Sequence, residues 1–373
     1  MKLNETSHIP HPTHQTKLDS RDVLIVLALI VATIVLYRPS LTAEFVSLDD
    51  YMYVVDNESV RNPSMESVKR FFGEVLHPTT VDGYYQPLAM LSLMCDAWLT
   101  GGDGLDPFYY HLTNILLHGI AGGLVFLLMR TLFDSRMAAA ITAMLFLFHP
   151  VQVESVAWIS QRKSVLATCF ALGGVLAYVR FSRAKSIAWL LTSAALMALG
   201  NLAKPIVMPL PIVLILLDYW PLKRPILKCL PEKLVYVPIV AASAYIAWAS
   251  QSSTAMLGAP KFESFEMAAK WVGLLSYNFM LYLGNLLWPV FFHPIAQFPR
   301  TCRGRIPPLH AVLLQQQHWV PSQLHLYGAQ RGSLSAWSVL SFFCRPDSAA
   351  CTSPRPASAT DSCICRLSCC YCL

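Results

Sequence analysis

Long stretches without charged residues alternate with short charged segments along most of the chain. A membrane-spanning helix needs about 20 mostly apolar residues to cross roughly 30 Å of hydrocarbon. Eight stretches approach this length: 23–37, 112–129, 137–148, 164–179, 186–203, 206–217, 234–250 and 271–292. The sixth is the weakest, since it has only 12 residues and carries prolines at positions 209 and 211. The pattern predicts an all-α polytopic membrane protein with about eight spans over residues 23–292.

The first apolar stretch has two interpretations, a cleaved signal peptide or a retained membrane anchor. It follows a polar segment of 22 residues, and no small-x-small cleavage pattern comes after it. Both features favour a retained anchor, with residues 1–22 as a cytoplasmic segment.

Composition agrees with a membrane protein, because 55% of the residues are hydrophobic, only 13% are charged, and the mean hydropathy is +0.46. So few charges exclude a single soluble globule. The net charge of +6 does not indicate nucleic-acid binding, since the basic residues form no dense run with interleaved aromatics.

The distribution of charge predicts the orientation. Residues 38–110 carry four basic and eleven acidic residues, whereas the other early loops are basic. The positive-inside rule therefore places 38–110 outside as a large first loop, in the lumen or periplasm. In this topology Arg162, Lys163 and Lys204 lie on the outer side, against the rule. Such cations bind an anionic lipid headgroup, or they only cap helix ends and extend to the interface.

Two adjacent acids, Asp49 and Asp50, follow the first stretch by about ten residues. Neighbouring carboxylates repel each other, which raises one pKa, and a carboxylate near the interface can take a proton from an incoming hydroxyl. This chemistry suits glycosyl transfer, although an acid pair in a loop is more often merely solvated or turn-forming.

Polar residues also mark the outer ends of the second and third stretches. His111, Asn114 and His118 share one helix face, where hydrogen bonding between helices is favoured over a metal, since the two histidines lie more than about 10 Å apart along the axis. The third stretch breaks at His149-Pro150, before Glu154. Because a broken helix at membrane depth must be buried or line a watery cavity, we expect a pocket there, with Glu154, Arg162 and Lys163 at its wall.

Four motifs in this order resemble a known family. They are Leu48-Asp-Asp-Tyr51 with Val55-Asp-Asn57, Tyr110-His-Leu-Thr-Asn114 with His118, His149-Pro150 with Val153-Glu-Ser-Val-Ala-Trp158 and Arg162-Lys163, and Ala203-Lys-Pro205 with Leu217-Asp-Tyr-Trp-Pro-Leu222. Residues 20–290 are similar to the membrane part of bacterial and eukaryotic O-mannosyltransferase-like proteins, which combine many spans with C-terminal tetratricopeptide repeats.

The resemblance implies a GT-C architecture and transfer of a sugar, with inversion, from a polyprenyl-phosphate carrier to a protein or lipid hydroxyl on the outer face. It implies Asp49 as the base with Asp50 beside it. It also implies that Arg162, Lys163 and Lys204 bind the lipid phosphate, with His111 and Glu154 as further pocket residues. Neither a metal nor another cofactor is expected. The compartment would be the bacterial inner membrane, or the endoplasmic reticulum in a eukaryote.

The segment 293–373 departs from the family pattern. From residue 291 onward there are seven arginines, no lysine and two acids, and eight of the eleven cysteines lie between positions 302 and 372. A metal cluster and lipidated cysteines are weaker interpretations, because the usual paired cysteine spacing is missing. We expect a disordered tail that arises from a reading-frame change or gene-model error, which leaves the activity of this chain open.

Three functions remain in view: a glycosyltransferase, a transporter or lipid-carrier flippase, and a noncatalytic truncated homologue. Broken helices and intramembrane charges also mark transporters, but a transporter does not need the acidic outer loop. The sequon Asn57-Glu58-Ser59 in that loop is either a glycosylation acceptor or a chance match.

Overall fold

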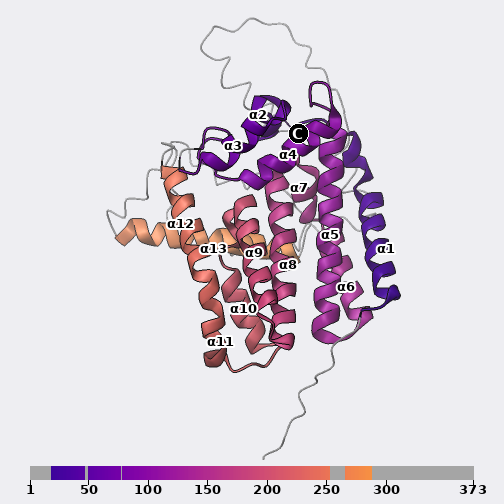
Figure 1. The fold of residues 1–373 in the computed structure, drawn as a ribbon, viewed down its shortest axis with the longest axis vertical. Helices are drawn as coiled ribbons and strands as arrows, with labels where there is room; N and C mark the ends of the chain where they lie inside the picture. Colours follow the sequence, from indigo (N-terminus) through magenta and orange to yellow (C-terminus); the bar gives the residue numbers. More distant parts are fainter. Residues whose placement is uncertain (1–17, 47–48, 77, 253–264, 288–373) are drawn as a thin grey trace, which may run out of the picture. The chain divides into compact units, whose positions relative to one another are not determined.

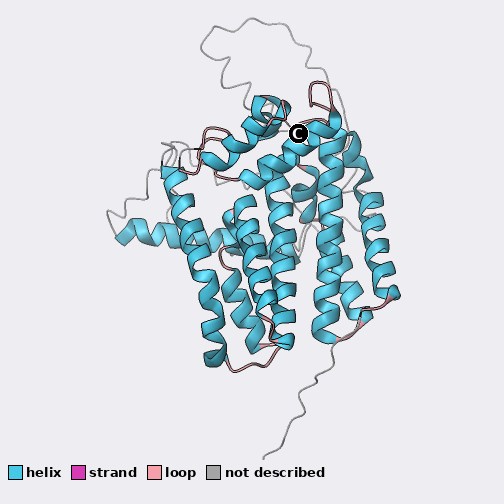
Figure 2. Cartoon of the chain, in the orientation of Figure 1, coloured by secondary structure: helices cyan, strands magenta, loops and turns pink. Residues whose placement is uncertain are grey.

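The computed structural model describes residues 18–46, 49–76, 78–252 and 265–287. The chain divides into two compact units, 1–333 and 334–373, and every described residue belongs to the first. All regular elements within those described ranges are helical (Figures 1 and 2). This confirms the all-α prediction, while the tail 293–373 lies outside the described residues.

The predicted apolar stretches form helices. In chain order these are α1 (Ser20–Tyr37), α5 (Pro107–Phe133), α6 (Arg136–Phe148), α8 (Arg162–Ala184), α9 (Ile187–Ala203), α10 (Leu210–Tyr219), α12 (Val237–Ser252) and α13 (Phe265–Leu287). Within the part of the chain that the structure describes, four helical segments are long and apolar enough to cross a membrane: Ser20–Thr42, Pro107–Phe133, Ile159–Ala184 and Ile226–Ser252. The last includes the short α11 (Ile226–Lys233).

Local sequence signals set where these helices begin and end. Asp19 caps α1 by accepting bonds from the first-turn amides, and Asp106 with Pro107 begins α5. α6 ends at Phe148, since Pro150 forces His149 into an extended conformation, and the chain turns through α7 (Gln152–Ala157) before α8. The predicted break of the third stretch is therefore confirmed.

Small residues bring the helices close together. Gly122 of α5 faces Leu147 of α6 so closely that an added Cβ would lie 2.5 Å from the leucine side chain. Ser193 of α9 donates a hydrogen bond to the carbonyl of Gly174 in α8 at 2.7 Å. Close approach of this kind is how membrane helices gain packing energy where lipid offers no hydrophobic driving force. The resulting bundle has α5, α8 and α9 side by side at its centre (Figure 1).

The outer loop folds into a helical cap with its own core. It contains α2 (Glu58–Arg61), α3 (Met65–Gly73) and α4 (Pro87–Thr100), and a turn of π-helix covers Tyr51–Val55. Buried side chains such as Val60, Phe71 and Leu93 pack together beneath it. The cap therefore holds the acid pair in a folded structure next to the ends of the spans.

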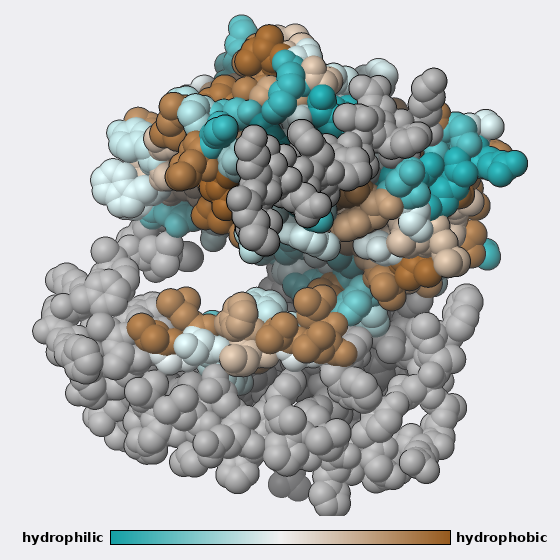
Figure 3. All heavy atoms as spheres, turned by 90° about the horizontal axis from the view of Figure 1, so that it is seen from below, coloured by the Kyte–Doolittle hydropathy of each residue, from teal (hydrophilic) through white to brown (hydrophobic). Residues whose placement is uncertain are grey.

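The opposite end of the bundle gathers the basic residues that were predicted to be cytoplasmic. Arg136 pairs with Asp22 at 2.8 Å, which joins the start of α6 to the start of α1. Arg224 and Lys233 both pair with the buried Asp218 at the end of α10. Figure 3, which views the molecule from below relative to Figure 1, shows hydrophilic patches beside hydrophobic ones on this face.

Candidate functional site

The site lies where the outer loop meets the chain break between α6 and α8. Asp50, at the start of the π-helical turn, accepts hydrogen bonds from the backbone amides of Val46 at 3.0 Å and Ser160 at 2.8 Å. Its side chain is fully buried. Burial raises the pKa of the Asp50 carboxyl, while the two backbone donors act in the opposite direction. Asp50 thus ties the loop to the segment that precedes α8.

Asp49 points elsewhere and stays partly open. Its side chain is 41% exposed, and Oδ2 lies 3.4 Å from Nζ of Lys163. The two neighbouring acids therefore have different surroundings: one is buried and held by backbone amides, and the other faces a cation at an accessible position. Of the two, Asp49 has the access that a base acting on an incoming hydroxyl requires.

Lys163 is held by aromatic and carboxylate groups of the outer loop. Its Nζ donates to the hydroxyl of Tyr53 at 3.0 Å and lies 4.1 Å from the centre of the tyrosine ring. The buried Tyr53 hydroxyl in turn donates to Oε1 of Gln86 at 3.0 Å. This chain of contacts from Gln86 through Tyr53 and Lys163 to Asp49 contains two residues, Tyr53 and Gln86, that sequence analysis missed. Nothing in their spacing marked them.

Lys204 reaches the same level from the end of α9. Its ammonium donates to the hydroxyl of Ser164 at 2.8 Å and interacts electrostatically with Lys163 and with the exposed Glu154. Burial lowers the pKa of Lys204, and Glu154 opposes that shift. Two of the three outer cations, together with Asp49 and Glu154, thus form one cluster, which we call the outer charge cluster.

Arg162 is separated from that cluster. Its side chain is completely buried, and its guanidinium pairs with Asp96 of α4 at 2.6 Å. It also donates to the side chains of Asn114 and Ser92 and to the carbonyl of Tyr110. Groups of α4 and α5 thus surround the guanidinium, so Arg162 links these two helices to the start of α8.

The polar face of α5 has the expected interhelical role at two of its three positions. Asn114 donates to the carbonyls of Val156 and Trp158, and His118 bonds the carbonyl of Leu147 at 3.1 Å. His111 is buried beside the backbone of Ala43 and Ala157, and neither ring nitrogen makes a hydrogen bond of normal geometry to a described residue. His111 therefore lies beneath the outer loop, apart from the two lysines.

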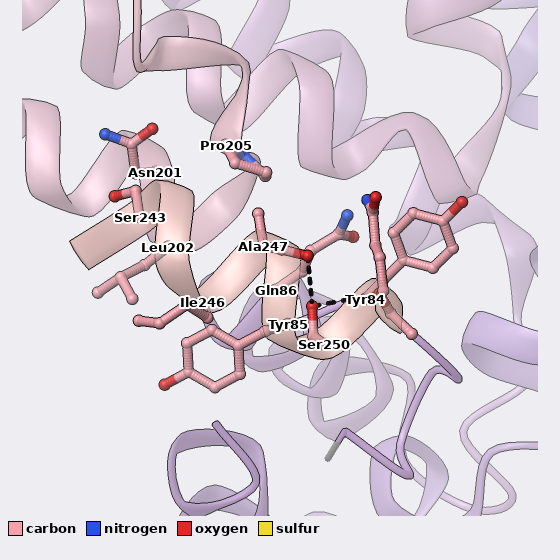
Figure 4. A pocket seen from close by; sticks show the side chains of 12 residues that line it. Tyr84, Tyr85, Gln86, Asn201, Leu202, Pro205, Ser243, Ile246, Ala247 and Ser250 are labelled. Atoms are coloured by element: carbon pink, nitrogen blue, oxygen red, sulfur yellow. Dashed lines mark hydrogen bonds between the residues drawn. The ribbon is translucent and has the colours of Figure 1, made fainter. Parts of the chain in front are cut away.

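A half-open cavity lies next to the outer charge cluster, between the loop before α4, the end of α9 and the end of α12. Its volume is about 40 Å³, several times what one water molecule requires. Figure 4 shows the labelled side chains of α12 facing those of α9 and the loop. Two wall residues connect it to the cluster: Gln86 contacts Tyr53, and Pro205 follows Lys204 directly. This cavity is not the pocket predicted at the His149-Pro150 break, because neither the break nor Glu154, Arg162 or Lys163 contributes to its wall.

A second acidic group, at the opposite end of the bundle, has a different character. Asp218, Cys229 and Glu232 lie close enough to share a cation. However, Arg224 pairs with both carboxylates, and Lys233 pairs with Asp218. Two fixed cations already neutralise these two acids, so the group has the character of a buried ion-pair network that joins α10 to α11.

Comparison with known proteins supplies the family context. Residues 104–248 match the family model described as dolichyl-phosphate-mannose-protein mannosyltransferase. The chain is 37% identical over 154 residues to protein O-mannosyl-transferase TMTC1 of Mus musculus. The aligned segment covers 40% of this chain and 16% of that protein. It is 34% identical over 175 residues to Tmtc1 of Drosophila melanogaster, covering 46% of this chain and 20% of the relative.

A third relative, TMTC3 of Mus musculus, is 27% identical over 191 residues, covering 49% of this chain and 20% of that protein. The chain thus spans about a fifth or less of the length of these relatives. No solved structure matches it. The long apolar helices and these relatives together indicate an integral membrane protein. The resemblance seen in the motifs is confirmed: this chain is similar to the protein O-mannosyltransferases, with the matched segment running from the end of the outer loop into α12.

Proposed function

We propose that the chain carries the donor-binding end of a membrane mannosyltransferase, which moves mannose from a polyprenyl-phosphate carrier to a hydroxyl of a protein or lipid acceptor. The outer charge cluster carries the proposal, because it combines an accessible carboxylate with two lysines at the outer ends of the spans. The names of the relatives, all protein O-mannosyl-transferases, support the sugar and the acceptor class.

In the proposed reaction Lys163 and Lys204 bind the phosphate of the carrier, whose chain lies in the bilayer. Asp49 takes the proton of the acceptor hydroxyl as its oxygen attacks the anomeric carbon. The sugar–phosphate bond breaks, the polyprenyl phosphate leaves with the electron pair, and the configuration inverts. Because Lys163 contacts Asp49, a phosphate bound to that ammonium lies near the base.

The other predicted residues have supporting roles in this proposal. Asp50 positions the loop through the Ser160 amide, and Arg162 clamps α4 and α5 to the start of α8. Glu154 balances the charge of Lys204, and His111 packs beneath the loop. The proposed location is the bacterial inner membrane or the endoplasmic reticulum, with the outer loop facing away from the cytoplasm.

The test uses the purified chain in lipid nanodiscs with labelled mannosyl polyprenyl phosphate and a peptide rich in serine and threonine. We expect Asp49→Asn to lower transfer about 10²- to 10⁴-fold, the range for a lost general base, while donor binding persists. Asp82→Asn, an exposed acid of the same loop, is the matched control.

Lys163→Ala and Lys204→Ala should weaken donor binding, whereas Lys228→Ala, an exposed lysine at the opposite end, should not. Transfer should survive chelation of divalent cations. Full transfer by Asp49→Asn would contradict the base assignment, and undiminished binding by both lysine variants would contradict the phosphate site. Carrier movement across the bilayer without transfer would instead favour a flippase.

A further inference from the structure

The cavity beside the outer charge cluster has an unusual lining for a site next to two lysines. None of its twelve wall residues is charged. Its polar groups are the amides of Gln86, Asn201 and Gln251 and the hydroxyls of Ser243 and Ser250, with the aromatic residues Tyr84 and Tyr85 alongside (Figure 4). Neutral amides and hydroxyls both donate and accept hydrogen bonds, as the hydroxyl groups of a sugar do.

One wall group has unused hydrogen-bonding capacity. Asn201 is 7% exposed, and its Nδ2 donates to the carbonyl of Met197 within α9. Its Oδ1 is buried and has no hydrogen-bond partner among the described residues. A buried acceptor without a donor is unfavourable, because it has lost its bonds to water, and a ligand hydroxyl that enters the cavity would supply the missing donor. Asn201 therefore points to a ligand that donates hydrogen bonds.

Gln86 connects the cavity to the charged residues. It is 6% exposed, lines the cavity, and accepts the hydrogen bond from Tyr53, whose hydroxyl also contacts Lys163. A molecule with a phosphate at the lysines and a neutral, hydroxylated group next to that phosphate matches this arrangement. The volume of about 40 Å³ fits the hydroxyl-bearing edge of a sugar ring rather than the whole ring.

We propose that this cavity is the subsite that receives the hydroxyl groups of the donor's sugar, and that Gln86 and Asn201 give the protein its preference for a sugar-bearing carrier over the bare carrier phosphate. The inference rests on the proposed function, since it assumes a polyprenyl-phosphate sugar as the donor. A site built to hydrogen-bond a hydroxyl discriminates strongly against ligands that lack it, because its buried polar groups are then left unpaired.

The experiment measures binding of two probes to the chain in nanodiscs: a polyprenyl monophosphate and its mannosyl derivative. We expect the wild type to bind the mannosyl derivative at least about tenfold more tightly, which corresponds to about 1.4 kcal/mol. Gln86→Leu and Asn201→Leu should each remove most of this preference. Asn201→Leu should also leave the affinity for the bare phosphate unchanged, because Asn201 is not part of the chain of contacts from Gln86 through Tyr53 to Lys163. Lys163→Ala should weaken the binding of both probes by the same factor.

Thr192→Leu is the matched control for Asn201→Leu, because Thr192 also bonds a carbonyl of α9 but is exposed on the helix surface. Thermal melting verifies the fold of each variant. Asn201→Leu keeps the test valid if Gln86→Leu does not fold, since loss of Gln86 leaves the Tyr53 hydroxyl without its acceptor. Equal binding of both probes by the wild type, or an unchanged preference in the folded cavity variants, overturns the subsite alone. Binding of neither probe by the wild type overturns the proposed function as well.

Discussion

Replacing Arg162 by methionine tests whether this cation clamps helices or binds a ligand. The guanidinium is fully buried and lies 2.6 Å from the carboxylate of Asp96, which is itself 3% exposed. Methionine has a similar length but leaves that carboxylate buried and unpaired. Removing one partner of a buried ion pair costs about 3–5 kcal/mol, because the remaining charge has lost its compensation. We expect Arg162→Met to destabilise the chain by this amount.

The assay is thermal unfolding in a mild detergent, and its readout is the fraction of protein that stays monodisperse at each temperature. The double variant Arg162→Met with Asp96→Leu should recover much of the lost stability, since it removes both charges together. Arg183→Met, a partly exposed arginine near the other end of α8, is the control and should have a small effect. If Arg162→Met melts at the same temperature as the wild type but binds the donor more weakly, the clamp is refuted. Arg162 would then belong to the phosphate site, as the sequence predicts.

Three further predictions follow from single positions. Because burial raises the pKa of Asp50, its carboxyl is protonated more readily in the folded state, so stability should fall as pH rises from about 4 through the raised pKa; Asp50→Asn should flatten this part of a pH series of melting curves, and an unchanged slope would contradict the assignment. Asn57 is 8% exposed and donates both to Met52 and to Thr80; glycosidase treatment of chain made in a secretory pathway should therefore give no mobility shift at this sequon. Gly122→Ala should cost about 1–3 kcal/mol in melting experiments, since the added methyl meets Leu147, whereas Gly73→Ala, with open space around it, should be close to neutral.

The helices were predictable from the sequence, because membrane spans depend on long apolar stretches and on their breaks. His149-Pro150 predicted the end of α6, and the acidic composition of 38–110 predicted a distinct outer segment. The helical cap that this segment forms was harder to predict from the sequence. Its core joins Val60, Phe71 and Leu93, which are distant from one another along the chain. The same limit applies to Tyr53 and Gln86: 33 residues separate them, and only the folded loop brings their side chains together.

Arg162 and Lys163 show why the charged site was only partly predictable. Both lie against the positive-inside rule, so sequence reasoning gives them the same role. They begin α8, where successive side chains point about 100° apart around the axis. Arg162 therefore faces Asp96 of α4, while Lys163 faces Asp49 of the outer loop. The ion pair of Arg162 fixes the cap to the spans. Because the cap is fixed, Lys163 is held beside the partly exposed Asp49. The clamp and the outer charge cluster are thus built by neighbouring residues of one helical turn, and a change that loosens the first should also displace the second.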